Sequence, residues 1–254
     1  MVKVLVAKLT SCSGCLSELI YALTHSDIKA NYSVTYFTEI LDIDKISDAE
    51  LAFIEGSVTT KHQEEFLKDV RSRVEFIVAL GTCALMGGVQ SLRLEGRIED
   101  VKRAVYPEPH YIDILSEVKP VDSVIKVDFA VPGCPVNGDA LVSFLRKYAL
   151  GGLPVAIYET VCSECKRRGI PCVVVMRKTP CLGPVTTSGC GALCPQFGRG
   201  CYGCYGLEFF DISRENIKAL VDRLLEFRVD EANIRALLLA YSFKLYSKLQ
   251  ESRC

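Results

Sequence analysis

Cysteine is the residue type of this sequence that is most able to do chemistry, because thiolates bind zinc ions and iron–sulfur clusters. The 254 residues include thirteen cysteines. Twelve of them fall into three sets of four, and the thirteenth, Cys254, stands alone at the C-terminus and is assigned no role. Three sets of four thiolates at these spacings predict three iron–sulfur clusters and a function in electron transfer.

The first set combines a CxxC pair with two isolated residues: Cys12, Cys15, Cys83 and Cys134. Each of the three segments directly follows a predicted strand. In a doubly wound sheet, ligands gather at the carboxyl ends of the strands, so these loops can bring four thiolates to one edge. The alternatives are buried, inert cysteines or a zinc site, but structural zinc sites generally use compact CxxC pairs. The pattern therefore favours a cluster.

The other two sets lie close together in the sequence. By sequence order we group Cys162, Cys165, Cys172 and Cys181, then Cys190, Cys194, Cys201 and Cys204. Each group contains a CxxC pair, which spans at most about 10 Å and can bind one ion or cluster. Sequence order does not exclude an exchange between the groups, and two structural zinc sites are the alternative for these eight thiols.

Two charged features lie near the cysteines. Glu55 follows a predicted strand, so it could share the sheet edge with the first set, although a surface glutamate is the commoner outcome. Lys166-Arg167-Arg168 follows the CxxC pair of the second set. A solvated turn is the default interpretation of such a short basic run, and a weaker hypothesis is that it steers an acidic redox partner.

Composition places the chain among ordinary globular proteins. Apolar residues make up 49%, charged residues 24%, and the net charge is −1, which indicates neither disorder nor a nucleic-acid partner. We see no signal peptide, no twin-arginine leader and no apolar run of roughly 18 to 20 residues, so we expect a cytoplasmic protein without a membrane span. A reducing compartment favours cluster or metal ligation over disulfides. We interpret His25, His62 and His110 as solvated or hydrogen-bonded histidines without a ligand role.

The elements that must position the first set follow a pattern of short apolar strands alternating with amphipathic helices. Strands are predicted over residues 2–7, 33–37, 51–55, 74–80 and 124–131. Helices are predicted over residues 14–23, 61–71 and 139–148. The pattern predicts an α/β fold, with a flavodoxin-like, doubly wound parallel sheet over residues 1–156.

A second domain is predicted over residues 157–254. Its first part, about residues 158–210 and here called the annex, holds eight cysteines and eight glycines. Such a loop-rich stretch cannot close an ordinary core, so we expect metals to hold it together. Two helices should follow and pack back on the body, one with apolar residues at helical spacing from Ile217 to Leu225 and one from about residue 230 to 248.

Short motifs around the first set resemble those of the electron-transfer subunits of [NiFe] hydrogenases and of the related subunit of respiratory complex I. They are Cys12-Ser-Gly-Cys15, Glu55-Gly-Ser-Val, Gly81-Thr-Cys83 with Gly87-Gly88-Val89, and Pro132-Gly-Cys134-Pro. The complex I subunit keeps only the proximal cluster, whereas the annex motifs resemble hydrogenase small subunits. These motifs are Cys181-Leu-Gly-Pro, Gly189-Cys190-Gly-Ala-Leu-Cys194-Pro and Gly198-Arg-Gly-Cys201-Tyr-Gly-Cys204. Among hydrogenases, the sequence is similar to the cytoplasmic multimeric group, which includes archaeal sulfhydrogenases and methanogen hydrogenases that do not reduce deazaflavin.

The resemblance, over about residues 1–210, implies three [4Fe–4S] clusters in this chain. The proximal cluster would be held by the first set, the distal cluster by the second and the medial cluster by the third. The proximal cluster would face a nickel–iron site in a separate large subunit, and Glu55 would lie near that boundary with an interface or proton-transfer role. Further subunits, either flavin and iron–sulfur subunits or subunits of the heterodisulfide-reductase type, would accept the electrons.

Two residues depart from the pattern of the periplasmic enzymes. Cys162 stands where those enzymes have a histidine ligand, and Cys194 stands where they have a proline beside a three-iron cluster. The resemblance therefore implies an all-cysteine distal site and a four-iron medial cluster, which suit low-potential carriers. The alternative functions are a quinone- or membrane-linked relay of the complex I type and a zinc-stabilised scaffold protein.

Overall fold

A five-stranded parallel sheet forms the centre of the first half of the chain. The structure is a computed structural model that describes residues 1–43, 45–95, 97–153, 159–207 and 214–251. The strand order is β2-β1-β3-β4-β5, and every adjacent pair is parallel. The strands are β1 (Val2–Lys8), β2 (Tyr32–Phe37), β3 (Ala49–Glu55), β4 (Val74–Leu80) and β5 (Phe129–Val131).

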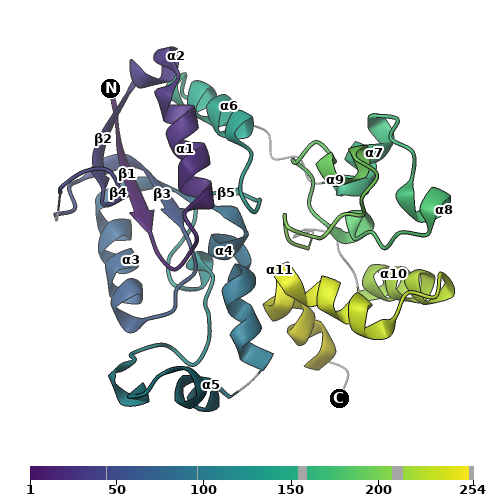
Figure 1. The fold of residues 1–254 in the computed structure, drawn as a ribbon. Helices are drawn as coiled ribbons and strands as arrows, with labels where there is room; N and C mark the ends of the chain where they lie inside the picture. The colour runs from purple at the N-terminus through teal and green to yellow at the C-terminus, as the bar shows by residue number, and fades with distance from the viewer. Residues whose placement is uncertain (44, 96, 154–158, 208–213, 252–254) are drawn as a thin grey trace.

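Helices cover both faces of this sheet, which explains its near-continuous apolar strands. One face packs against α1 (Gly14–Thr24) and α6 (Gly138–Ala149), with Leu19 and Phe144 completely or almost completely buried. The other face packs against α3 (Lys61–Arg73), which buries Leu67 and Val70. The layers are visible in Figure 1. The prediction of an α/β, doubly wound fold is confirmed.

The predicted strand over 124–131 is wrong in its first half. Residues 124–128, which follow the 3₁₀ helix η3 (Val121–Ser123), form no strand, and the ladder with β4 begins where Phe129 pairs with Val78. Asp128 explains the late start, because its carboxylate Oδ2 accepts the Ile77 amide at 2.9 Å and the Arg71 guanidinium at 2.6 Å. A side chain therefore takes an amide that a longer strand would have paired.

Between β4 and β5 the chain makes a long excursion that the sequence pattern does not predict. It contains α4 (Gly81–Met86), η1 (Gly88–Glu95), α5 (Ile98–Val105), η2 (Pro109–Tyr111) and η3. A shorter helix, α2 (Ser26–Lys29), lies before β2. The functional consequence is at α4, because this helix begins directly after β4 and carries Cys83.

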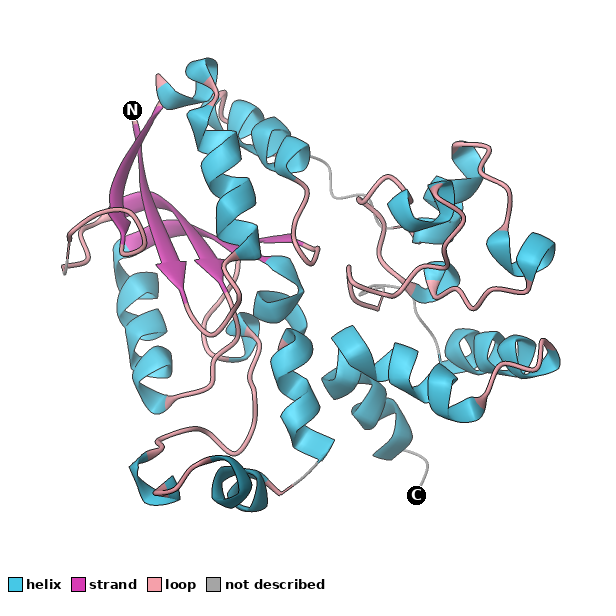
Figure 2. Ribbon diagram, in the orientation of Figure 1, coloured by secondary structure: helices cyan, strands magenta, loops and turns pink. Residues whose placement is uncertain are grey.

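The described part of the annex, residues 159–207, consists mostly of loops, as Figure 2 shows. Its short helices are α7 (Val161–Arg167), α8 (Val173–Arg177), η4 (Gly183–Val185) and α9 (Leu193–Gln196). Its apolar cluster is small and includes Cys181 and Cys201 among its buried members. The predicted domain boundary at residues 156 and 157 lies outside the described residues.

Two helices follow the annex, α10 (Arg214–Glu226) and α11 (Glu231–Glu251), as the apolar spacing predicts. Helix α11 contacts η1 and α4, so the C-terminal region packs back on the sheet domain. At Ser242 the helix departs from helical geometry, and its hydroxyl accepts the Leu207 amide at 3.1 Å. None of the described helices is long and apolar enough to span a membrane.

Candidate functional site

The structure places the first cysteine set at the carboxyl edge of the sheet. Cys12 follows β1, Cys15 lies in the first turn of α1, Cys83 lies in α4 after β4, and Cys134 follows β5. The pKa of Cys15 is raised to about 12, mainly by burial, and nearby Glu55, Cys83 and Cys134 contribute to the rise. Burial, Cys134 and Cys12 likewise raise the pKa of Cys83, to about 11. The four thiols are therefore close enough to interact electrostatically.

Two glycines leave room for the sulfur atoms of this set. A Cβ atom on Gly81 would lie 2.4 Å from Cys15 Sγ, and one on Gly88 would lie 2.6 Å from Cys83 Sγ. Both glycines have positive φ angles, 78° and 60°, which larger residues rarely adopt. The backbone can thus approach the thiols only because these positions lack side chains.

Glu55 lies directly behind the first set, and its interpretation as a surface residue is wrong. Glu55 is the last residue of β3 and is only 1% exposed. Its Oε1 accepts the Cys15 amide at 3.1 Å, and its Oε2 accepts the Ser11 hydroxyl at 3.0 Å. Burial raises the pKa of this carboxyl group. Glu55 therefore fixes the Cys12–Cys15 loop against the end of β3.

The second set comes together within the annex. Cys162 and Cys165 lie in α7, Cys172 occupies the N-cap position of α8, and Cys181 precedes η4. Burial raises the pKa of Cys165, and Cys162, Cys181 and Cys172 add to the shift in that order. Cys172 is exposed, whereas Cys181 is buried. The set thus reaches from the interior of the annex to its surface.

The third set lines a single cavity of about 410 Å³, which Cys134 of the first set also lines. The four residues are Cys190, Cys194, Cys201 and Cys204. Burial raises the pKa of Cys204 to about 11, with further contributions from Cys190, Cys194 and Cys134. The third set also contacts the second set, because the Cys201 amide donates to Cys181 Sγ at 3.2 Å. The third set therefore lies between the first and the second.

Two residues that the sequence patterns do not single out hold these sets in place. Glu164 of α7 accepts three backbone amides of the Cys190 loop: Gly191 at 3.0 Å, Ala192 at 3.2 Å and Gly189 at 3.3 Å. Thr82 of α4 donates its hydroxyl to the Cys204 carbonyl at 2.6 Å. Glu164 thereby joins the second set to the third, and Thr82 joins the first to the third.

Tyr205 is a third residue that the sequence patterns do not single out. It is 6% exposed, and burial strongly raises its pKa, with contributions from Cys190, Cys204, Glu164 and Cys15 in that order. Its ring thus lies near cysteines of both the first and the third set. The glycines that flank Cys204 and Tyr205 predict a turn, which is no signal of a buried tyrosine.

The donors in all three sets are free thiols, the ligand type that iron–sulfur clusters use. Among the described His, Cys, Asp and Glu side chains, no group of three is arranged to hold one metal ion. Backbone amides also point at the sulfurs: Gly203 donates to Cys201 Sγ at 3.4 Å, and Leu193 and Ala192 donate to Cys190. Hydrogen bonds to sulfur are one means by which proteins set cluster potentials.

Residues 12–148 match the protein family described as "NADH ubiquinone oxidoreductase, 20 Kd subunit". Sulfhydrogenase 2 subunit delta of Pyrococcus furiosus is 36% identical over 236 residues, which cover 91% of this chain and 96% of the relative. A chain of the F420-non-reducing hydrogenase vhu of Methanococcus voltae is 31% identical over 234 residues, covering 78% of this chain and 80% of the relative.

Solved structures share the fold. A chain of the actinobacterial-type NiFe-hydrogenase from Ralstonia eutropha H16 gives a TM-score of 0.58 at 16% identity, covering 99% of this chain and 89% of that one. A chain of an NAD⁺-reducing [NiFe]-hydrogenase in its H2-reduced state gives 0.55 at 24% identity, covering 62% and 96%. The α/β fold thus recurs in proteins of distant sequence.

Proposed function

Because the chain belongs to the family of NADH ubiquinone oxidoreductase 20 kDa subunits, and within it to the small subunits of [NiFe] hydrogenases, we propose that it relays electrons through three [4Fe–4S] clusters. The relay runs between the nickel–iron site of a large subunit and a downstream acceptor. The clusters would each take up and release one electron when bound. The chain itself supplies their order, spacing and surroundings.

The order of the cysteine sets is the observation that carries this proposal. The first set interacts with the third through Cys134 and Cys204, and the third contacts the second through Cys201 and Cys181. This order supports the assignment of the first set as proximal, the third as medial and the second as distal. Cys12 is exposed at one end of the series and Cys172 at the other. Each end of the relay is thus open to a partner.

The residues around the cysteines exclude water and hold the sulfurs. Cys15, Cys181 and Cys201 are buried, and the buried Tyr205 lies near cysteines of the first and third sets. Burial and amide hydrogen bonds both influence the potential of an iron–sulfur cluster. Glu55 positions the loop of the proximal ligands through its bond to the Cys15 amide. We assign it to the boundary with the large subunit.

The partner at the proximal end would be a [NiFe] hydrogenase large subunit. The exposed Cys12 lies at the carboxyl edge of the sheet, where a covering subunit would shield the cluster from water. At the distal end, flavin and iron–sulfur subunits or subunits of the heterodisulfide-reductase type would accept electrons. We place the assembly in the cytoplasm, where free thiols stay reduced.

The complex I type of relay is less well supported. The family match ends at residue 148, so it contains the first cysteine set only. The eight annex cysteines lie beyond it, in the part of the chain that the sulfhydrogenase relative also covers. Two clusters in addition to the proximal one are expected of a hydrogenase small subunit, whereas the complex I subunit keeps only the proximal cluster.

The test is to purify the chain anaerobically with its large subunit and to expose the complex to hydrogen. We expect the iron–sulfur absorbance to bleach and a viologen dye to be reduced. Cys83→Ser, which removes a proximal ligand, should abolish dye reduction while the annex clusters remain. If hydrogen reduces the nickel–iron site and the clusters of this chain stay oxidised, the relay proposal is wrong.

A further inference from the structure

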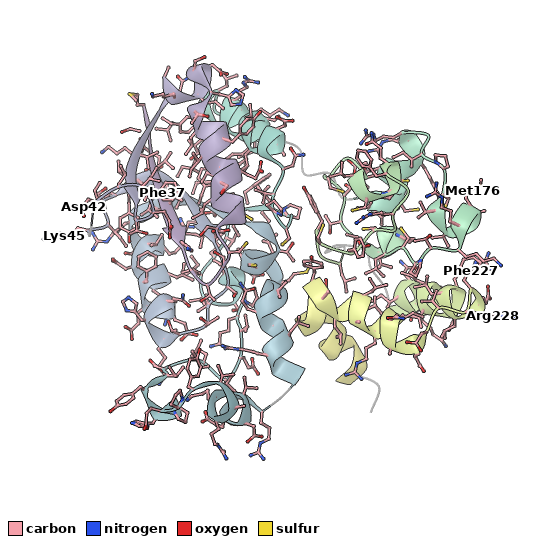
Figure 3. The ribbon with its side chains drawn as sticks, viewed as in Figure 1. Phe37, Asp42, Lys45, Met176, Phe227 and Arg228 are labelled. Carbon is pink, nitrogen blue, oxygen red and sulfur yellow. The ribbon has the colours of Figure 1, made fainter. Side chains whose placement is uncertain are left out.

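Gln90 lies between two segments that carry ligands of the first set. It belongs to η1, and its side chain is half-buried. Its Oε1 accepts the Cys83 thiol at 3.4 Å, and its Nε2 donates to the Thr10 carbonyl at 3.0 Å. Thr10 precedes Cys12 at the carboxyl edge of the sheet, which Phe37, the last residue of β2, marks in Figure 3. One side-chain amide thus joins a ligand sulfur to the start of the CxxC loop.

Gly88 allows this amide to lie beside the sulfur. A Cβ atom at residue 88 would lie 2.6 Å from Cys83 Sγ and 3.1 Å from Gln90 Oε1. Gly88 also has a positive φ of 60°, which larger residues rarely adopt. The contact between the amide of Gln90 and the sulfur of Cys83 therefore depends on a position that lacks a side chain.

The Thr10 carbonyl does not depend on its bond to Gln90. It also accepts the Ser57 amide at 3.0 Å and the Ser57 hydroxyl at 3.4 Å. Because a carbonyl oxygen has two lone pairs, three donors are more than it needs. If the Gln90 amide turned away, the Thr10 oxygen would keep a backbone partner.

The amide orientation in the structure suits a free thiol and not a bound ligand. Cysteine binds metal as the thiolate, which has no proton to donate and only accepts hydrogen bonds. The Gln90 oxygen would then face a negatively charged sulfur. A half-turn about the last side-chain bond of Gln90 exchanges its oxygen and nitrogen, so that Nε2 points at Cys83 Sγ instead.

We propose that the Gln90 amide donates a hydrogen bond to Cys83 Sγ when the first set holds its cluster, and that this bond raises the reduction potential of the cluster. A donor stabilises negative charge on the sulfur, and this charge increases when the cluster takes up an electron. The inference rests on the proposed function, because the first set must hold a cluster. It adds a residue outside the cysteine sets that controls how readily the first cluster is reduced.

The first measurement is a redox titration of the complete complex, followed by electron paramagnetic resonance. The proximal signal is the one that Cys83→Ser alters. Gln90→Met keeps a side chain of similar length but removes the donor. At the wild-type midpoint we expect the ratio of reduced to oxidised proximal cluster to fall about tenfold, which is about 59 mV for one electron. Gln90→Glu, which only accepts when ionised, should lower the ratio at least as far.

Gln63→Met is the matched control. The Gln63 Nε2 donates to the Thr10 hydroxyl at 3.1 Å, and its Oε1 accepts the Thr59 amide at 2.8 Å and the Thr60 amide at 3.2 Å. Gln63 therefore also holds Thr10, and it takes part in the capping box of α3. We expect Gln63→Met to lower the denaturation midpoint and to leave the proximal potential unchanged. Equal potential shifts in the Gln63 and Gln90 variants would mean that Gln90 only holds Thr10, which contradicts the donor role.

The second measurement decides which end of the amide faces the sulfur. Electron spin echo spectroscopy of the reduced proximal cluster detects nitrogen nuclei that are hydrogen-bonded to its sulfurs. With nitrogen-15 in the glutamine side chains of this chain, we expect a coupling in the wild type that Gln63→Met keeps and Gln90→Met lacks. Absence of this coupling from the wild type would disprove the proposed bond, whatever the potentials are.

The outcomes separate this proposal from the relay. If both measurements give the expected results but hydrogen does not reduce the clusters, the relay is wrong and the donor role of Gln90 stands. If hydrogen reduces the clusters and either measurement gives the opposite result, the donor role is wrong and the relay stands. A first set that holds no cluster would contradict both.

Discussion

The cysteine sets depend on neighbouring residues that position the backbone close to the sulfur atoms. Glu55 fixes the Cys15 amide, Glu164 fixes the Cys190 loop, and Gly81 makes space for Cys15 Sγ. Both carboxylates accept backbone amides, and charge-assisted hydrogen bonds of this kind are stronger than neutral ones. The geometry of the site therefore depends on these backbone amides and glycines as well as on the cysteines.

Replacing Cys194 tests the ligand assignment at the medial position. Residue 194 lies in the first turn of α9, where proline is tolerated. We expect Cys194→Pro to leave three cysteines in the third set and to convert one four-iron cluster into a three-iron cluster. Electron paramagnetic resonance of the oxidised protein should show a three-iron signal that Cys254→Ser, the control, lacks. Absence of that signal in a loaded variant would disprove the medial assignment.

Replacing Glu164 tests its positioning role. Glu164→Gln removes the negative charge and one of the two acceptor oxygens that bind Gly189, Gly191 and Ala192. We expect a loss of about 1–3 kcal/mol in unfolding free energy and a more positive potential of the medial cluster. Redox titration and denaturation measure the two effects. The control, Glu159→Gln, disrupts a surface pair with Arg167 and should shift neither the potential nor, beyond about 1 kcal/mol, the stability.

Among the elements, the sheet and its helices follow from sequence periodicity, but the path after β4 does not. Strands β1 to β4 and helices α1, α3 and α6 occupy the predicted ranges within a few residues. Helix α5 buries none of its residues, so no core packing marks it, and Asp128 shortens β5 through side-chain hydrogen bonds. Such contacts join residues about 50 positions apart, and local patterns carry no information about them.

In the candidate site, too, local sequence patterns predict some features and miss those that depend on contacts between distant residues. The sequence indicates which cysteines form sets, and the structure brings the members of each set together. Glu164 was not predicted, because its partners lie 25 to 28 residues away. Tyr205 was not predicted either, since its neighbours include Glu164 and Cys15, which are distant from it in the sequence. A residue that positions a ligand from a distant part of the chain has no recognisable spacing from that ligand in the sequence.

The contact between β2 and α6 gives a pH-dependent prediction. The Tyr32 hydroxyl donates to the Leu145 carbonyl at 2.7 Å, and burial raises the pKa of Tyr32 to about 12, with Tyr148 adding to the shift. Because the folded state prefers the neutral phenol, this stability is present below about pH 10 and is lost as the pH rises toward 12. In Tyr32→Phe, the loss of unfolding free energy over that interval should be smaller by about 2–3 kcal/mol.

Denaturation at several pH values measures this effect. Tyr111→Phe is the matched control, because the Tyr111 side chain is 78% exposed. An unchanged pH profile in Tyr32→Phe would show that the buried phenol does not govern the alkaline loss of stability.

At the scale of the whole molecule, the two halves have different sources of stability. The sheet domain has large apolar clusters on both faces. The described annex has a small cluster that includes cysteines, and three further annex residues, Leu182, Val185 and Leu207, pack against α10 and α11. Regions with few apolar contacts open more readily, and metal binding can supply their folding free energy. The annex should therefore depend on its clusters and the sheet domain should not.

Hydrogen exchange tests this difference. In cluster-free protein we expect fast exchange over residues 159–207 and slow exchange in β1, β3 and β4. In loaded protein the annex amides that bond to sulfur, such as those of Cys201 and Gly203, should become protected. Equal protection of the annex with and without clusters would mean that its own packing suffices.

The most direct test of the relay is the content of iron, acid-labile sulfide and zinc per chain after anaerobic purification. Three four-iron clusters predict about twelve iron and twelve sulfide, with reduced-cluster signals in electron paramagnetic resonance. Nickel should appear only where the large subunit copurifies. About four iron with two zinc would leave the proximal cluster alone and make the annex structural, and zinc without iron would contradict electron transfer altogether.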